Sequence, residues 1–161
     1  MNHNYGTAMN YDHPKLTFVY PTFAREGMST NGPFIPDIGW QAGQFPEKIM
    51  LYVSVGLMLN SRKPYSYDID ILFNEVSLTP EDAQDIESKL INTAVSNRDD
   101  FVAISTNLIK DVVLPDAGLY TIKTRLYAGK ADSSEKEMID ECSSYFTVAE
   151  HWKSNDMKRT D

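Results

Sequence analysis

Residues 114–127, with the sequence LPDAGLYTIKTRLY, decide the fold of this chain. Turn-forming residues occupy 115–118, and from Tyr120 onwards the two faces of the run differ in character. One parity of the run consists of Tyr120, Ile122, Thr124 and Leu126. A period of two is typical of a strand with one face on a core and the other in water. The stretch therefore predicts a turn that leads into a half-buried strand at 120–127.

The Asp-x-Gly-x-Tyr pattern of residues 116–120 resembles the tyrosine corner of immunoglobulin-like sandwiches. In that motif the tyrosine phenol bonds back to the backbone a few residues upstream. The resemblance covers about 101–150 and implies an antiparallel sandwich of the immunoglobulin-like or Greek-key type. Ile122 stands where antibody domains carry a cysteine, so the resemblance is to the wider class of sandwiches.

Further alternating segments predict the other strands. The strongest is 48–59, whose odd-numbered residues from Ile49 to Leu59 are aliphatic and must face a core. Residues 60–64 have the length of a hairpin turn and lead to a second alternating run at 65–74. The remaining predicted strands are 15–20, stopped by Pro21; 101–105 and 107–114, with an irregularity near Lys110 and Asp111; and 144–148.

One segment has the signals of a helix. Thr79 reads as an N-cap, Pro80 as the first helical residue, and Glu81 and Asp82 as acids that complement the helix dipole. One helical face carries Ala83, Ile86, Leu90 and Ala94. We therefore expect an inserted α-helix at about 80–92. Because a parallel sheet needs many crossover helices, the sequence predicts a mainly β, antiparallel β-sandwich with this one helix inserted.

The totals indicate one globular domain. The chain has 161 residues, of which 42% are hydrophobic and 24% charged, and its net charge is −8. We expect a flexible arm at 1–14, a single domain at 15–152 and a flexible tail at 153–161. The negative charge argues against a nucleic-acid ligand, which requires a basic stripe. The start of the chain lacks a secretion signal and the apolar run at 49–59 is too short to cross a bilayer, so a cytoplasmic protein without a membrane partner is expected.

Few residues here point to catalysis. Cys142 is the only cysteine, and the three histidines lie in the arm or near the tail, at His3, His13 and His151. Nucleophilic catalysis and metal binding both require several groups placed by rigid elements. We therefore expect a non-enzymatic protein with no cofactor and no metal.

Asp68 and Asp70 are the most site-like carboxylates, because a strand places them on one face roughly 7 Å apart. With Glu75 nearby, they are candidates for a calcium site or a carboxylate-dependent hydrolase. Alternating acids on the wet face of a sheet are also the ordinary arrangement, and they discourage pairing between sheet edges.

The segment 21–46 is the predicted binding surface. It is rich in glycine and proline, fits no helix or strand pattern, and carries aromatic residues. The predicted binding residues are Phe23, Phe34, Trp40 and Phe45. These rings either pack beneath the segment as core or anchor a protein partner.

From these features we expect a protein-binding or adaptor module, resembling small acidic accessory proteins of bacteria or their phages. The partner is another protein, or a second copy in a homodimer, and the acidic loop 128–141 is a second candidate surface. The alternative is a carbohydrate-binding module that stacks sugars on Trp40, Tyr52 or Tyr127.

Overall fold

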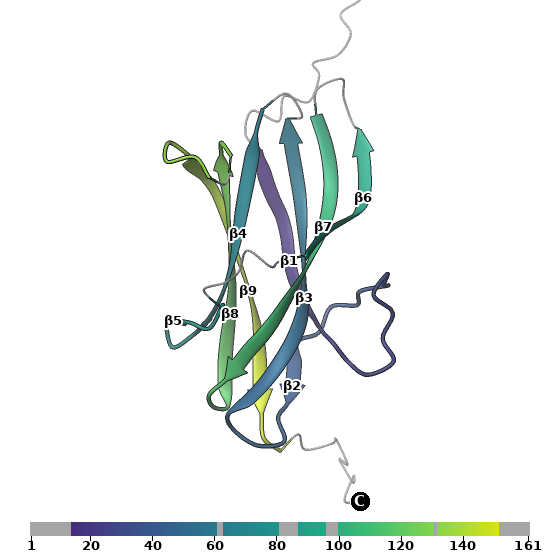
Figure 1. The fold of residues 1–161 in the computed structure, drawn as a ribbon, viewed down its shortest axis with the longest axis vertical. Helices are drawn as coiled ribbons and strands as arrows, with labels where there is room; N and C mark the ends of the chain where they lie inside the picture. The colour runs from purple at the N-terminus through teal and green to yellow at the C-terminus, as the bar shows by residue number, and fades with distance from the viewer. Residues whose placement is uncertain (1–13, 61–62, 81–86, 96–99, 131, 152–161) are drawn as a thin grey trace, which may run out of the picture.

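Two β-sheets packed face to face form the molecule, as Figure 1 shows for a computed structural model that describes residues 14–60, 63–80, 87–95, 100–130 and 132–151. Sheet A contains, in spatial order, β1 (Lys15–Phe23), β3 (Glu47–Asn60), β7 (Asp100–Leu114) and β6 (Glu87–Val95). Sheet B contains β2 (Gly39–Gln41), β9 (Glu137–Ala149), β8 (Gly118–Ala128), β4 (Tyr65–Phe73) and β5 (Val76–Ser77). The predicted mainly β sandwich is confirmed. The predicted arm and tail fall almost wholly outside the described residues.

The core lies between the sheets and uses the predicted faces. The odd-numbered residues of β3 from Ile49 to Leu57 are at most 6% exposed, and Leu59 packs against the same cluster. From sheet B, the predicted face of β8 is fully buried; it consists of Tyr120, Ile122, Thr124 and Leu126. Each large apolar side chain buried in this way contributes about 1.5–3 kcal/mol.

Polar contacts also join the two sheets. The phenol of Tyr67 in sheet B contacts Ser105 Oγ at 2.6 Å and donates to Asn107 Oδ1 at 2.9 Å, and both partners are in β7 of sheet A. Near the start of β1, the backbone N–H of Leu16 donates to Asp140 Oδ2 of β9 at 2.9 Å. These directional bonds constrain how one sheet lies on the other.

The predicted helix at 80–92 is wrong. Residues 87–95 form β6, which pairs antiparallel with β7, and the described residues contain no helix. Residues 81–86 lie outside the described part of the chain. The capping signals at Thr79 and Pro80 favour a helix only locally. The edge of β7, in contrast, presents a row of backbone N–H and C=O groups with which residues 87–95 can pair. Pairing of this kind overrides local propensity.

Two further boundaries differ from expectation. Residues 60–64 do not close a hairpin, because β3 and β4 lie in different sheets and the chain crosses between the layers there. Pro21 does not stop β1, which continues to Phe23 with Pro21 opposite Val53. A proline is tolerated because β1 is an edge strand, where one side of the backbone needs no ladder partner.

β7 is one strand with a bulge at the predicted irregularity. Val112 pairs with Ile49 and Ile109 with Leu51, so two residues of β7, Lys110 and Asp111, lie opposite the single residue Met50, and β7 has one extra residue there. Asp111 has a φ of 58°, the left-handed conformation that often accompanies a bulge. The loop predicted at 128–141 is shorter than expected, because β9 already begins at Glu137.

Candidate functional site

Residues 24–38 form a long connection between β1 and β2, which we call the tethered loop. In Figure 1 it projects beside the lower part of sheet A. An ion pair closes its two ends: Arg25 Nη1 and Nη2 donate to the carboxylate of Asp37 at 2.9 and 3.1 Å. Asp37 Oδ2 also accepts the backbone N–H of Phe23 at 2.9 Å. The hydrogen bonds that Arg25 donates to Asp37 hold the pKa of Arg25 above its ordinary value.

Backbone groups of the loop are bound to the strands beside it. The phenol of Tyr20 donates to the carbonyl of Phe34 at 3.0 Å, and Thr22 Oγ1 donates to the carbonyl of Ile35 at 2.8 Å. At the end of the loop, the N–H of Thr147 in β9 donates to the carbonyl of Ile38 at 3.0 Å. The loop is therefore held to both sheets and presents a defined surface.

Two of the predicted binding residues are buried. Phe23 is fully buried, and its ring centre lies 5.2 Å from those of both Trp40 and Phe146. Phe34 is 9% exposed and packs on Tyr52, on the outer face of sheet A, with ring centres 4.6 Å apart. The packing of these two rings holds the segment 21–46 against the sandwich.

The other two predicted binding residues are half-buried. Trp40 lies in β2, and its indole N–H donates to Glu47 Oε2 at 3.1 Å. Phe45 also packs against the core cluster. The structure thus gives all four aromatic residues packing contacts, and contact with a partner stays a prediction.

Sequence reasoning missed the exposed residues of this segment. Ile35 is 68% exposed and Ile38 is 79% exposed. Met50, whose carbonyl accepts the N–H of Ala24 at the start of the loop, is 41% exposed. One sequence signal could have identified these residues: Ile35 and Ile38 stand among prolines, a glycine and Asp37. Such a segment forms no strand or helix that would bury them.

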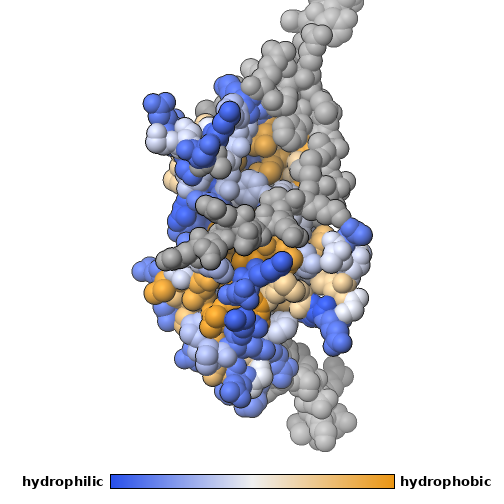
Figure 2. All heavy atoms as spheres, in the orientation of Figure 1, coloured by the Kyte–Doolittle hydropathy of each residue, from blue (hydrophilic) through white to orange (hydrophobic). Residues whose placement is uncertain are grey.

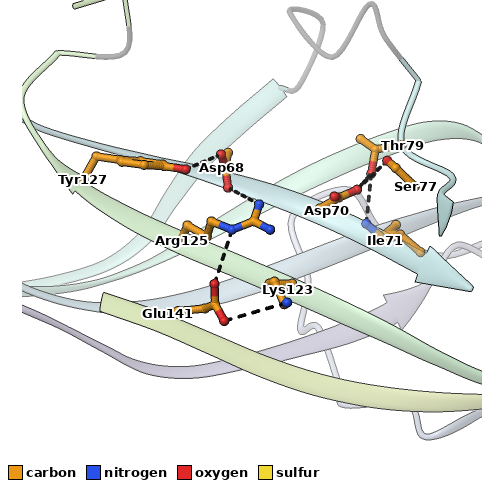
Figure 3. Close-up of polar contacts among 9 residues, drawn as sticks. All are labelled: Asp68, Asp70, Ile71, Ser77, Thr79, Lys123, Arg125, Tyr127 and Glu141. Atoms are coloured by element: carbon orange, nitrogen blue, oxygen red, sulfur yellow. Dashed lines mark hydrogen bonds and ion pairs between the residues drawn. The ribbon is translucent and has the colours of Figure 1, made fainter. Parts of the chain in front are cut away.

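The predicted acidic pair forms two separate networks (Figure 3). Asp68 accepts a hydrogen bond from the phenol of Tyr127 at 2.9 Å, and its Oδ1 lies 3.7 Å from Arg125 Nη1. Asp70 accepts hydrogen bonds from Ser77 and Thr79. The pKa of Tyr127 is raised, first by burial and then by its hydrogen bond to Asp68.

The carboxylates therefore lie on one face, as predicted, but each has its own partners. Glu75, the third candidate, is exposed in the turn after β4 with a φ of 65°. Among the described residues, no group of three or more His, Cys, Asp or Glu is placed to hold a metal ion. Arg125 lies beside the charge of Asp68, whereas Asp70 is bound by two neutral hydroxyl groups.

The rings of the carbohydrate alternative lie on different surfaces. Trp40 is in β2 at the edge of sheet B, and Tyr52 lies on the outer face of sheet A beneath Phe34. Tyr127 is on the outer face of sheet B, with Lys136 Nζ 4.4 Å from its ring centre. The three rings do not make one stacking platform.

Cys142 is partly buried in β9 and packs against the core. Burial, followed by the nearby charge of Asp140, raises the pKa of its thiol, so the reactive thiolate is disfavoured.

In the described part of the chain, no helix is long and apolar enough to cross a membrane.

Comparison with known proteins gives no match, either to the models of protein families or to curated protein sequences.

Proposed function

We propose that the chain is a protein-binding module built on an immunoglobulin-like sandwich, with the tethered loop as its contact surface. The strand order supports the sandwich type. Lettered in chain order, the seven long strands β1, β3, β4, β6, β7, β8 and β9 correspond to strands A to G of that fold. In spatial order sheet A then reads A, B, E, D and the long strands of sheet B read G, F, C, as in that fold. β2 and β5 are short additional strands at the two edges of sheet B.

The bond predicted for the tyrosine corner supports the same assignment. The phenol of Tyr120, near the start of β8, donates to the carbonyl of Asp116 at 2.5 Å. In immunoglobulin-like domains this contact joins the corresponding strand to the turn before it. The topology and the corner are independent features, since one concerns sheet order and the other a single side chain.

The observation that carries the proposed activity is the exposure of Ile35 and Ile38 on a loop that is itself held in place. Ordering a loop on binding costs free energy, and a loop already bound to its scaffold avoids much of that cost. Large apolar side chains presented on such a scaffold are suited to fill pockets on a partner. No reacting group is required for this role, in agreement with the partnered carboxylates and the raised thiol pKa.

Cross-linking tests the proposal. A photoreactive amino acid replaces Ile35 in one protein and Met138, which is 51% exposed on β9, in the control. Both are expressed in the native cells and irradiated. We expect a specific protein adduct from position 35 and none from position 138.

The captured protein is then purified and its affinity measured by calorimetry. The double variant Ile35→Asp/Ile38→Asp should weaken binding at least tenfold, while Met138→Asp should leave it unchanged. Equal binding by wild type and the double variant contradicts the proposal. Trp40→Ala is a poorer test, because Trp40 packs on Phe23 and its loss disturbs the fold.

A further inference from the structure

β1 is a long edge strand without charged residues along most of its length. It has nine residues, whereas the edge strands of sheet B, β2 and β5, have three and two. From Leu16 to Phe23 its sequence is LTFVYPTF, which is uncharged and rich in β-branched and aromatic residues. An edge of this length and composition is a template on which a strand of another chain can pair.

The backbone of β1 alternates between bonding to β3 and facing the free edge. The N–H of Ala24, directly after β1, donates to the carbonyl of Met50 at 3.0 Å, so Thr22, of the same parity, also bonds to β3. The backbone groups of Pro21 and Phe23 therefore point to the free edge. Because Pro21 has no N–H, three groups remain there: one N–H and two carbonyls.

The tethered loop provides partners for all three of these groups. The N–H of Asp37 donates to the carbonyl of Pro21 at 2.8 Å. Asp37 Oδ2 accepts the N–H of Phe23 at 2.9 Å, and Arg25 Nη1 donates to the carbonyl of Phe23 at 3.3 Å. Asp37 thus lies where the next strand of sheet A would pair.

A second carboxylate closes the other end of the same edge. The N–H of Leu16 donates to Asp140 Oδ2 at 2.9 Å, and Asp140 lies on β9 of the opposite sheet. The register of β1 with β3 shifts between Leu16 and Phe18, which places a bulge at Thr17. Bulges and prolines are features by which natural proteins discourage pairing at sheet edges, and β1 has both.

The contacts of the tethered loop with β1 come from its last residues, 34–37. The projecting part of the loop lies on the right in Figures 1 and 2. Figure 2 shows a mixture of hydrophilic and weakly hydrophobic residues there, which gain little from burial. Attachment of the loop along the edge of β1 is therefore a property of residues 34–37 and their hydrogen bonds.

We propose that the tethered loop and Asp140 protect the edge of β1 from pairing with β1 of a second copy. Without these contacts, the β1 strands of two copies pair antiparallel and join two four-stranded sheets into one. Two-fold symmetry closes this assembly at two copies. The role goes beyond partner binding, because it requires neither Ile35 nor Ile38.

Sedimentation velocity over a range of concentrations compares wild type with Asp37→Ala/Asp140→Ala. We expect the variant to self-associate at least tenfold more strongly, because two edge N–H groups lose their acceptors. The matched control is Asp116→Ala/Asp132→Ala, which removes two exposed carboxylates, one of them an acceptor for the N–H of Ala117 at 2.8 Å. Each double variant changes the net charge from −8 to −6, and the control should behave as wild type.

A third substitution tests whether the association uses β1. Thr17→Lys, at an exposed residue, places a charge in the uncharged run and should abolish the association of Asp37→Ala/Asp140→Ala. By hydrogen exchange, the N–H groups of Leu16 and Phe23 should lose protection in the dilute double variant and regain it at high concentration.

Melting curves establish that each variant is folded. If the alanine pair does not fold, Asp140→Ala alone, with Asp116→Ala as its control, should still associate more strongly than wild type, since it leaves the tethered loop bonded. A folded variant that associates no more than wild type overturns the proposal. So does an association that Thr17→Lys leaves unchanged.

Discussion

Tyr120 combines a packing role and a polar role in one side chain. Its ring stacks between those of Phe73 and Phe146, with centres 4.4 and 5.1 Å away, and its hydroxyl reaches the carbonyl of Asp116. The sequence pattern identified this residue because both the turn before it and the alternation after it are local signals.

Tyr120→Phe keeps the ring and removes the bond to Asp116. We expect a loss of about 1 kcal/mol in the free energy of unfolding. For a chain of this size that corresponds to a fall of roughly 2–4 °C in melting temperature. Thermal denaturation at neutral pH measures it. An unchanged melting temperature would show that the corner bond contributes nothing.

The same residue makes stability depend on alkaline pH. Burial is the main cause that raises the pKa of Tyr120 in the folded protein above its unfolded value of about 10. The stabilisation that the protonated Tyr120 contributes is therefore fully present below about pH 10. Above it the unfolded chain ionises first, so stability falls as pH rises towards the folded pKa. Tyr120→Phe should show a smaller loss of melting temperature between about pH 9 and 11 than wild type. Equal losses in the two proteins would contradict this assignment.

Thr124 is a buried polar group in the opposite situation. It is fully buried, and within the described part of the chain its Oγ1 has no hydrogen-bond partner. Thr124→Val replaces this hydroxyl with a methyl group of the same shape, and we expect the free energy of unfolding to rise by about 1 kcal/mol. Melting temperature again provides the measurement.

Thr106→Val is the matched control, because Thr106 Oγ1 is buried and hydrogen-bonded to Ser54 Oγ at 3.0 Å. This variant should lower the melting temperature by leaving Ser54 without that bond. A decrease from both substitutions would refute the distinction between the two hydroxyls.

At the scale of elements, the tethered loop depends on Asp37. This carboxylate holds Arg25 and the N–H of Phe23 together. Asp37→Ala removes both contacts, so we expect the loop to open more often, about tenfold for each 1.4 kcal/mol lost. Trypsin cleavage after Arg25 measures opening. Cleavage after Lys136, which is exposed in the separate loop before β9, is the control and should keep its wild-type rate. Unchanged cleavage after Arg25 would mean that the ion pair does not hold the loop.

Strands could be predicted from the sequence where the signal is local. They could not be predicted where the structure depends on pairing with a strand distant in sequence. The alternation of β3, β4 and β8 identified their buried faces. Residues 87–95 carry helical spacing and yet pair with β7, because only the sheet edge, unknown from the sequence, decides between the two structures. The first half of β9 read as an acidic loop because its charges lie on or near the wet side of an outer strand.

The candidate site was predictable only in location. Glycine, proline and aromatic content marked the segment that contains the tethered loop. The large aromatic residues were predicted as anchors, but burial stabilises large rings most. Phe23 therefore lies in the core, and Phe34 is buried against Tyr52 on the outer face of sheet A. Which smaller residues remain outside depends on how the loop folds back on β1, and that path follows from the bonds of Tyr20 and Thr22.

For the whole molecule, a net charge of −8 opposes the compact state through self-repulsion. Salt screens this repulsion over about 10 Å at 0.1 M. We therefore expect the melting temperature at neutral pH to rise between low and moderate NaCl concentration, measured at low protein concentration. The control Glu26→Lys/Glu135→Lys changes two exposed residues, takes the net charge to −4, and should show a smaller rise. A larger rise in this variant would contradict the explanation.

The chain enters the sandwich at the top of β1 and leaves it at the bottom of β9, at opposite poles of the long axis (Figure 1). β9 alone has 13 residues, which corresponds to a span on the order of 40 Å. Proteins fused ahead of β1 and behind β9 would therefore be kept apart by the length of the sandwich between them. A pair of fluorophores attached in these two places would report unfolding by a change in energy transfer, without any label on either sheet.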